Sequence, residues 1–236
     1  MTVSNPLVTV VVAVHNGERY LRSALESLYA QDYEPFEVVF VDDGSTDGSA
    51  AIAQAFPGIR YVRQENQGLA AARNTGLSLA RGELLAYLDD DDLIPPHKLR
   101  RQAEYLVANP DVGCVLGRQE IRLEPGVDPP AWLTRDPVFG DLDGIPLVSA
   151  MIRTELLRDV GGFDPSYRFA EDRDLFVRLR ERGVRIEVIP EVLLFRRFHG
   201  ENMNFRSRPQ KHPLLRSLKA KIDREHAASD DERMAQ

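Results

Sequence analysis

Four consecutive aspartates, Asp89–Asp92, follow directly after the apolar segment Ala86–Leu88. Adjacent carboxylates repel one another, and a hydrophobic core offers them no compensation. A divalent cation compensates for this repulsion. Mg²⁺ takes hard oxygen ligands, and typically one or two carboxylates hold the ion while substrate phosphates complete its shell. The aspartates therefore predict a metal–diphosphate site. A Ca²⁺-binding loop is excluded, since the alternating acidic ligands, central glycine and distal glutamate of that motif are absent.

Two further polar clusters follow apolar segments: "HNGE" at His15–Glu18 and "DDGSTD" at Asp42–Asp47. Ligands of an open parallel α/β sheet bind outside the carboxyl ends of its strands, so we expect all three clusters at one sheet edge. The alternative is that each cluster is a polar turn that caps a helix, because Asp and Ser favour that position. A cap needs only one such residue, so this alternative is weakest for Asp89–Asp92. The chain has neither "GxxxxGKS/T" nor "GxGxxG", which disfavours P-loop enzymes and Rossmann dehydrogenases.

The elements that must position these clusters alternate along the first 110 residues. The β-branched segment Leu7–Val14 is typical of a strand buried on both faces of a parallel sheet. Apolar residues at helical spacing then predict an amphipathic helix within residues 15–31. The alternation continues with strands at 36–41, 59–64 and 83–88 and helices at 48–56 and 68–82, the second with Gly82 as its C-terminal cap. This order predicts a doubly wound, mostly parallel α/β sheet.

Beyond residue 110 the pattern is less regular. Residues 111–123 and 185–199 are typical of strands, the second interrupted at Pro190, and residues 170–183 predict a helix. A short strand and a helix are expected within 148–164, and the Pro-, Gly- and Asp-rich residues 124–144 predict a long loop. We expect one domain over residues 1–206, with halves at 1–110 and 111–206, and a polar tail at 207–236 that is helical or partly disordered.

The composition is that of an ordinary globular protein, with 43% hydrophobic and 28% charged residues among 236. The net charge of −7 argues against a nucleic-acid-binding surface. The one cysteine, Cys114, rules out an intramolecular disulfide and is compatible with a reducing compartment. The N-terminus lacks the basic start of a signal peptide, and no apolar segment has the length of a membrane span. We therefore expect no transmembrane segment and a cytoplasmic location, with the inner face of the membrane as an alternative.

Three landmarks stand in order along the chain: "VVVAVHNGERYL", "VDDGSTDGS" and "NQGLAAARNTGLSLARGELLAYLDDDD". Together they resemble the family 2 glycosyltransferases, and the resemblance runs from about residue 7 to about residue 200. "VGGFDPSYRFAEDRDLFVRL" is similar to the acceptor-side segment of that family, and "FRRFHGENM" to its closing strand. The resemblance implies a GT-A fold, a Rossmann-like doubly wound sheet with an acceptor-side subregion and a C-terminal helical tail. It also implies an inverting transfer of sugar from a nucleotide-diphospho-sugar to an acceptor hydroxyl.

The donor-binding residues follow from this resemblance. It implies that the nucleobase and ribose are held by Ala13, His15, Asn16 and Asp43. An aspartate accepts the N3–H of uracil or the N–H groups of guanine, so Asp43 does not fix the base. Asn66, Gly68 and Arg73 match the family's "NxGxxxARN" segment, where the glycine lets the backbone approach the nucleotide and the arginine contacts the ribose or diphosphate. The alternative for Arg73 is a surface ion pair.

The metal-binding residues also follow from it. The family's DxD motif maps onto Asp89, Asp90 and Asp91, with Asp91 as the metal ligand, Asp89 in the metal shell or on the ribose, and Asp90 beside the ribose. We expect Asp92 to cap the following turn. His199 matches a position where some members supply a third ligand, and imidazole suits Mn²⁺ better than Mg²⁺. Its alternative is a structural or surface histidine. The expected cofactor is a divalent metal, Mn²⁺ or Mg²⁺.

The catalytic pair is expected at Glu171 and Asp172. Acidic residues are favoured in the first turn of any helix, which is the alternative reading of this pair. In the family, the aspartate is the usual base that removes the proton of the acceptor hydroxyl as it attacks the anomeric carbon opposite the diphosphate. The metal stabilises the charge of the leaving diphosphate. We expect Asp172 as base, Glu171 as a neighbour that binds acceptor or donor sugar, and Asp174 facing elsewhere.

Three other residues have two readings each. Arg196 and Arg197 contact phosphate or form a solvated basic pair, and Trp132 stacks on a sugar or anchors its loop. The rival functions are a nucleotidyltransferase, whose usual Gly-rich basic N-terminal loop is absent, and a nucleotide-sugar-binding module without catalysis. The module would predict a broken acidic motif or a missing base, and neither is found.

The expected partners follow from the transferase reading. The donor is a nucleotide-diphospho-sugar, with UDP-sugars as the default and GDP- or dTDP-sugars as alternatives. The acceptor is a saccharide, a lipid-linked saccharide, a protein or a small molecule, in bacterial polysaccharide or glycoconjugate biosynthesis. Peripheral membrane contact is compatible with the sequence, and nucleic acid is not an expected partner.

Overall fold

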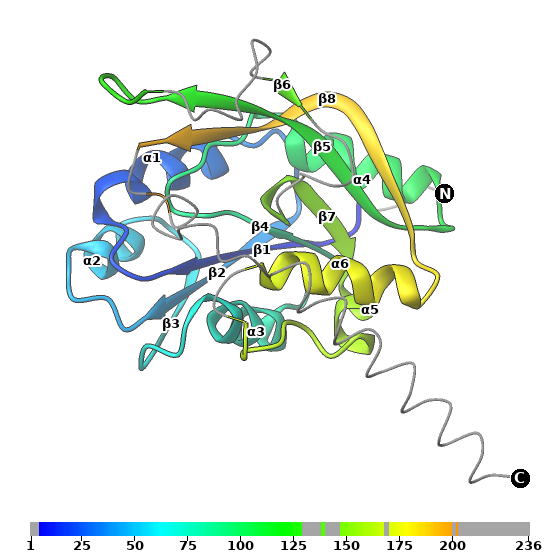
Figure 1. Ribbon diagram of the computed structural model, residues 1–236, viewed down its shortest axis with the longest axis horizontal. Coiled ribbons are helices and arrows are strands. Elements are labelled where there is room, and N and C mark those ends of the chain that lie inside the picture. Colours follow the sequence, from blue (N-terminus) through cyan, green and yellow to red (C-terminus); the bar gives the residue numbers. More distant parts are fainter. Residues whose placement is uncertain (1–4, 129–137, 140–146, 168–169, 200–201, 203–236) are drawn as a thin grey trace, which may run out of the picture.

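The computed structural model describes residues 5–128, 138–139, 147–167, 170–199 and 202. Within these ranges the strands form one eight-stranded sheet, and helices pack against both of its faces (Figure 1). The doubly wound α/β architecture predicted from the sequence is confirmed. The polar tail 207–236 and Trp132 lie outside the described residues.

The N-terminal half supplies four parallel strands: β1 Val8–Val14, β2 Phe36–Asp43, β3 Ile59–Gln64 and β4 Leu84–Tyr87. The helices between them are α1 Glu18–Tyr29, α2 Ser49–Gln54 and α3 Leu69–Leu79. Every residue of β1 is buried. Its side chains alternate between two cores because successive strand residues face opposite sides. Val10 and Val12 pack in the core that includes α1, whereas Val11 and Ala13 pack in the core that includes α3.

The C-terminal half completes the sheet with mixed pairing. Its elements are α4 Lys98–Ala108, β5 Val112–Leu123, β6 Val138–Phe139, the 3₁₀ helix η1 Leu147–Ser149, β7 Ala150–Arg153, α5 Thr154–Asp159, α6 Glu171–Glu181 and β8 Arg185–Phe198. The strand order is β3-β2-β1-β4-β7-β5-β6, and β8 pairs with β5 off this path. β7 is antiparallel to β4 and β5, whereas β8 is parallel to β5.

Two expectations for this half need correction. Residues 124–144 are not wholly a loop, because β6 lies among them and pairs with β5 at Gln119 and Glu120. β8 continues through Pro190, but its ladder with β5 passes from Ile189 directly to Val192. Proline has no N–H to give to a ladder, so the strand accommodates it at an irregularity.

Gly82 does not cap α3. The helix ends with Ala80 in an extended conformation (φ −62°, ψ 135°), and Gly82 has no positive φ. A Cβ at Gly82 would lie 2.6 Å from both the Leu7 carbonyl oxygen and the Thr9 nitrogen. Glycine is needed here because the chain passes against the start of β1, where the Gly82 N–H donates to the Thr9 hydroxyl at 2.9 Å.

The loops after β1 and β2 hold each other through reciprocal helix capping. The Glu18 N–H at the start of α1 donates to Asp47 Oδ2 at 3.0 Å, and the Gly48 N–H at the start of α2 donates to Glu18 Oε2 at 2.5 Å. The Gly17 N–H donates to Ser49 Oγ at 2.9 Å. Helix capping therefore explains Glu18, Asp47 and Ser49, and it fixes the edge of the sheet where the polar clusters meet.

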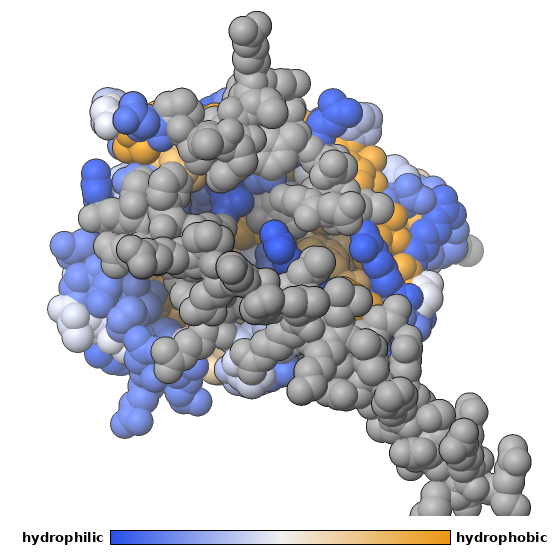
Figure 2. Space-filling model, viewed as in Figure 1, coloured by the Kyte–Doolittle hydropathy of each residue, from blue (hydrophilic) through white to orange (hydrophobic). Residues whose placement is uncertain are grey.

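The surface is that of an ordinary folded domain over the described residues. Figure 2 shows hydrophilic side chains around one face with hydrophobic ones between them, and the exposed large hydrophobic residues are Val107 and Leu123. None of the helices in the described ranges combines the length and the apolar character that crossing a bilayer requires.

Candidate functional site

The predicted donor residues meet at the carboxyl ends of β1, β2 and β3. His15 Nδ1 lies 2.7 Å from the Asp43 carbonyl oxygen, and the Asn66 amide lies 3.1 Å from His15 Nε2. A carbonyl oxygen only accepts, so Nδ1 carries the proton and, in the neutral ring, Nε2 accepts from Asn66 or from Asn16 at 3.2 Å. Three segments that are distant in sequence therefore converge. Ala13 lies beside them, buried in β1.

The Asp43 carboxylate is buried and accepts three hydrogen bonds within the protein. Oδ1 accepts from Gln64 Nε2 at 2.8 Å and from the Gln67 N–H at 2.9 Å, and Oδ2 accepts from the Gly68 N–H at 2.8 Å. A carboxylate has about four acceptor positions, so the hydrogen bonds with the described residues leave one of them unused. Gly68 has φ +89°, a conformation that favours glycine, and the space beside its Cα is open.

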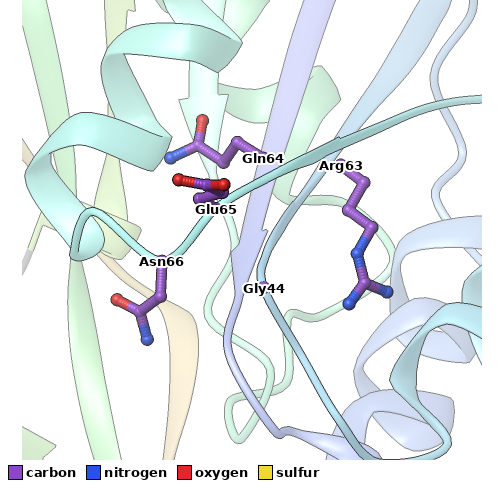
Figure 3. A pocket seen from close by; sticks show the side chains of 5 residues that line it. All are labelled: Gly44, Arg63, Gln64, Glu65 and Asn66. Carbon is purple, nitrogen blue, oxygen red and sulfur yellow. The ribbon is translucent and has the colours of Figure 1, made fainter.

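An open pocket of about 470 Å³ lies next to these residues (Figure 3). Arg63 flanks one side of it and Gln64, Glu65 and Asn66 the other, with Gly44 between them. Gly44 has φ +74°, and a Cβ there would lie 2.9 Å from the Asn66 nitrogen, so glycine allows the two loops to approach. Arg63, Gln64 and Glu65 were not predicted as site residues. Their position at the end of the predicted strand 59–64 was the available signal.

The four aspartates point to four different neighbours. Asp89 Oδ1 accepts from Arg73 Nη2 at 2.8 Å. The Asp90 carboxylate lies against Gly17, where a Cβ would come within 2.3 Å of Oδ2. Asp91 Oδ2 lies 3.1 Å from His199 Nε2 and accepts from Asn202 Nδ2 at 3.0 Å. Asp92 Oδ1 accepts from the Arg197 N–H at 3.1 Å.

The expectation that Asp92 caps the following turn is wrong. Asp92 instead connects the acidic cluster to β8 through Arg197, which lies 105 residues further along the chain. Its side chain is buried, and burial, followed by the charges of Asp91 and Asp89, raises its pKa well above the usual range. Burial also raises the pKa of Asp90 to about 7, and it raises the pKa of Asp91 against the opposing hydrogen bond from His199. Without a cation, the cluster thus carries fewer than four negative charges at neutral pH.

The Asp91–His199 pair has the chemistry of a metal site. The imidazole ring packs 4.7 Å from the Tyr20 ring, and its Nδ1 is buried without a hydrogen-bond partner among the described residues. An oxygen and a nitrogen ligand, 3.1 Å apart, are both types that Mn²⁺ accepts. Asn202, which the sequence did not identify, contacts both residues: its Nδ2 donates to Asp91 Oδ2, and its Oδ1 accepts from the His199 backbone N–H at 2.9 Å. In the part of the chain that the structure describes, no three acidic, Cys or His side chains form a complete metal site.

Arg73 is buried and joins the two halves of the site. Its Nη1 donates to Glu171 Oε1 at 2.7 Å and its Nη2 to Asp89, and its guanidinium carbon lies 5.7 Å from the Tyr87 and Phe163 ring centroids. Burial alone would lower the pKa of Arg73, but the charges of Asp89 and Glu171, with that of Asp172, outweigh it and raise the pKa. The surface ion pair considered for Arg73 is wrong, since only 3% of the residue is exposed.

The expected catalytic pair begins α6. Glu171 is buried on Arg73, whereas Asp172 is partly exposed and its Oδ1 accepts from the Arg173 N–H at 2.8 Å. Burial raises the pKa of Glu171, the Arg73 charge lowers it, and the Asp172 charge raises it further. Asp174 is buried on Arg178 at 2.7 Å, so its expected separation from the pair is confirmed.

Arg196 and Arg197, the adjacent arginines near the end of β8, differ in their surroundings. Arg197 is not a solvated basic residue: its guanidinium lies 4.5 Å from the Tyr20 ring centroid and donates to Ser23 Oγ at 3.0 Å. Arg196 is partly exposed, and its charge opposes the raised pKa of Asp91 and of Asp92. Arg196 is therefore the one of the two that remains a candidate for phosphate contact.

The chain is similar in sequence to known glycosyltransferases. The family profile described as glycosyl transferase family 2 matches residues 9–169. An uncharacterized glycosyltransferase of Rickettsia typhi is 31% identical over 210 residues, 83% of this chain and 65% of that protein. The putative glycosyltransferase EpsH of Bacillus subtilis is 45% identical over 95 residues, 39% of this chain and 28% of that protein. This chain thus spans less than two thirds of the length of either relative.

Two solved structures share the fold. TarS 1-349 of S. aureus in complex with UDP-GlcNAc has a TM-score of 0.70 at 25% identity, covering 85% of this chain and 61% of that one. The mannosyltransferase PcManGT of Pyrobaculum calidifontis, in complex with GDP-Man and Mn²⁺, has a TM-score of 0.65 at 26% identity, covering 86% and 59%. These likenesses identify the architecture as the GT-A fold.

Proposed function

Because this chain belongs to glycosyltransferase family 2, we propose that it is an inverting glycosyltransferase that moves a sugar from a nucleotide-diphospho-sugar to an acceptor hydroxyl. One observation carries the proposal. The buried Arg73 holds Asp89 of the acidic cluster and Glu171, the neighbour of Asp172, on one guanidinium. This contact supports the proposal, because it would bring a metal–diphosphate group and a base next to each other, as transfer of a sugar requires.

The donor binds with its base at the pocket beside Gly44 and with its ribose near His15, Asn16 and Asp90. Asp43 accepts an N–H of the base at its unused acceptor position. The neighbours bound to UDP-GlcNAc and GDP-Man support a nucleotide-sugar donor. A UDP-sugar is the default, with GDP- and dTDP-sugars as the alternatives.

Asp91 and His199 are the residues that would hold a divalent ion, Mn²⁺ or Mg²⁺, and Asp89 would assist them through the metal shell or the ribose. The Mn²⁺ complex of PcManGT supports the use of a divalent ion. Two protein ligands suffice when substrate phosphates complete the shell. The ion supplies charge neutralisation for the leaving diphosphate.

Asp172 takes the proton of the acceptor hydroxyl. The acceptor oxygen forms a bond to the anomeric carbon, the bond from that carbon to the diphosphate breaks, and its electron pair leaves with the diphosphate. The Arg173 N–H fixes Oδ1 of Asp172 and leaves Oδ2 to accept the proton. Glu171, whose Oε1 is bonded to Arg73, holds the segment in place and contacts sugar through its other oxygen.

The acceptor is a saccharide, a lipid-linked saccharide, a protein or a small molecule of bacterial polysaccharide or glycoconjugate biosynthesis. Residues 1–206 form the catalytic domain, with a nucleotide half at 1–110 and an acceptor half at 111–206. The cytoplasm or the inner face of the membrane is the proposed location.

A calorimetric panel tests the donor site. UDP, GDP, dTDP and their sugar conjugates are titrated with Mn²⁺ and with EDTA. We expect one nucleotide to bind, and only with the metal. Binding that is indifferent to EDTA would contradict the metal assignment, and binding of none would contradict the donor site.

The Asp172→Asn variant tests the base. Asparagine keeps the shape but cannot take a proton, so we expect donor affinity within twofold of wild type and a loss of at least about 10²-fold in release of nucleoside diphosphate. Asp174→Asn is the control for a carboxylate of the same helix, measured per folded molecule. A wild-type rate in Asp172→Asn would show that another group is the base. Donor binding without turnover in the wild-type protein would favour the non-catalytic binding module.

A further inference from the structure

Three consecutive side chains of α3 reach three separate parts of the site. Arg73 lies between Asp89 and Glu171, while Thr75 Oγ1 donates to Gln64 Oε1 at 2.7 Å, and Gln64 in turn donates to Asp43. Successive helix residues are about 100° apart, so these side chains leave the helix in different directions. α3 therefore connects the base pocket, the acidic cluster and the start of α6. The role of the middle residue, Asn74, is not explained by donor binding.

Asn74 holds the backbone of the acceptor-side segment. Its Nδ2 donates to the Phe163 carbonyl oxygen at 2.7 Å, and the Phe163 N–H donates to its Oδ1 at 2.8 Å. The side chain thus satisfies both backbone groups of one loop residue. The approach is close: Gly162 has φ +67°, and a Cβ there would lie 2.4 Å from Asn74 Oδ1.

Arg73 holds the other end of the same segment. Its partner Glu171 is the first residue of α6 and precedes Asp172. The residue before it, Ala170, has φ +63°, which costs energy for a residue with a Cβ and persists only where the surroundings impose it. The Phe163 ring packs edge-on to the Tyr87 ring, with centroids 5.5 Å apart. Tyr87 lies two residues before Asp89, the first aspartate of the cluster. Phe163 and Glu171 are therefore each fixed against the donor half.

We infer that Arg73 and Asn74 are positioning residues that set Asp172 relative to the Asp89 end of the acidic cluster. This inference rests on the proposed function. Neither residue transfers a proton; both act by fixing where α6 begins. A misplacement of about 1 Å between reacting groups costs about 10²-fold in rate, so loss of either anchor should lower turnover more than donor binding.

The variants are chosen to separate position from folding. Asn74→Ala removes both bonds to Phe163 and leaves the charges of the site unchanged. Arg73→Lys keeps the positive charge but cannot bond two carboxylates with a planar fork. Ser78→Ala is the matched control on α3, because its exposed hydroxyl bonds only to the Thr75 carbonyl of the same helix.

Each protein is titrated with UDP-GlcNAc and GDP-Man in the presence of Mn²⁺, and release of nucleoside diphosphate is measured per folded molecule. We expect Asn74→Ala to lower kcat by at least about tenfold with donor Kd within about threefold of wild type. Arg73→Lys should lower kcat as much, and Ser78→Ala should change neither quantity. A fall in melting temperature with unchanged kcat in Asn74→Ala, or equal losses in kcat and donor affinity, would overturn the inference. If the wild-type protein neither binds nor cleaves any donor of the UDP-, GDP- and dTDP-sugar panel, the proposed function fails, and the inference falls with its premise.

Discussion

At the scale of the residue, four chemically identical aspartates are distinguished by their neighbours. Asp91 lies beside His199 and Asn202, whereas Asp92 is buried on the Arg197 backbone N–H. Burial raises the pKa of Asp92 well above its usual range, which favours the neutral acid over the carboxylate in the metal-free protein, and asparagine has nearly the shape of that neutral acid. The two adjacent residues should therefore respond differently to the same substitution.

We predict that Asp91→Asn lowers metal-dependent nucleotide affinity by at least about 10-fold, because an amide oxygen replaces a charged ligand. Asp92→Asn should leave that affinity within about threefold, since its acceptor oxygen for Arg197 is kept. Calorimetric titration of both variants with the nucleotide, with Mn²⁺ and with EDTA, measures the difference. Equal losses in the two variants would mean that the metal ligand within the cluster has been assigned in the wrong register.

At the scale of the element, α4 carries a buried lysine that the site does not use. Lys98 is fully buried, and its Nζ donates to Gln102 Oε1 at 2.5 Å, while the Gln102 amide donates to the Val115 and Ser149 carbonyls. Burial lowers the pKa of Lys98 from 10.5 to about 7, against a small opposing effect of Cys114. The Gln102 amide thus joins α4 to β5 and η1, and a pKa of about 7 leaves the Lys98 amine that supports it about half neutral at pH 7.

This burial predicts a pH dependence of stability. Between pH 7 and pH 10.5 the unfolded chain holds a proton on Lys98 that the folded chain releases, so the free energy of unfolding rises with pH in this window. Below pH 7 Lys98 is protonated in both the folded and the unfolded chain, so its contribution to the free energy of unfolding is constant there and disfavours the folded state. The slope approaches about 1.4 kcal/mol per pH unit.

We predict that Lys98→Met removes this slope and raises the free energy of unfolding at pH 7, although Gln102 loses a donor. Urea unfolding of the wild-type protein and of Lys98→Met at pH 7, 8 and 9 measures the free energy of unfolding and its slope with pH. Arg100 is partly exposed and bonds to Asp32, and Arg100→Met is the control for loss of a cationic side chain on the same helix. Parallel pH profiles for wild type and Lys98→Met would show that the buried amine keeps its charge.

At the scale of the whole molecule, the sequence predicts what local patterns determine. The β-branched segment at Leu7–Val14 becomes β1, and the three polar clusters meet at one edge of the sheet because parallel strands share their direction. What it did not predict depends on contacts between distant residues. Arg73 and Glu171 are 98 residues apart, and Asn202 and Asp91 are 111 apart. The spacing of residues along the sequence does not predict such distant pairs. The burial of Arg73 and the contacts of Asn202 are therefore seen only in the folded chain.

The same reason explains the corrected elements. Gly82 is of the residue type that caps helices, but glycine is needed there because a Cβ would clash with the backbone of Leu7 and Thr9. Only the folded sheet brings that backbone near Gly82. β6 has two residues and exists only through its pairing with β5. Local sequence carries no signal for either.

The central claim is that this site transfers a sugar with inversion, and the configuration of the released sugar tests it most directly. The wild-type protein is incubated with Mn²⁺ and the α-linked donor UDP-GlcNAc, and the anomer formed first with water as acceptor is observed by proton NMR before mutarotation. A base on the face opposite the diphosphate predicts the β anomer, and its formation should stop in Asp172→Asn. The α anomer as first product, or equal formation by Asp172→Asn, would contradict the account.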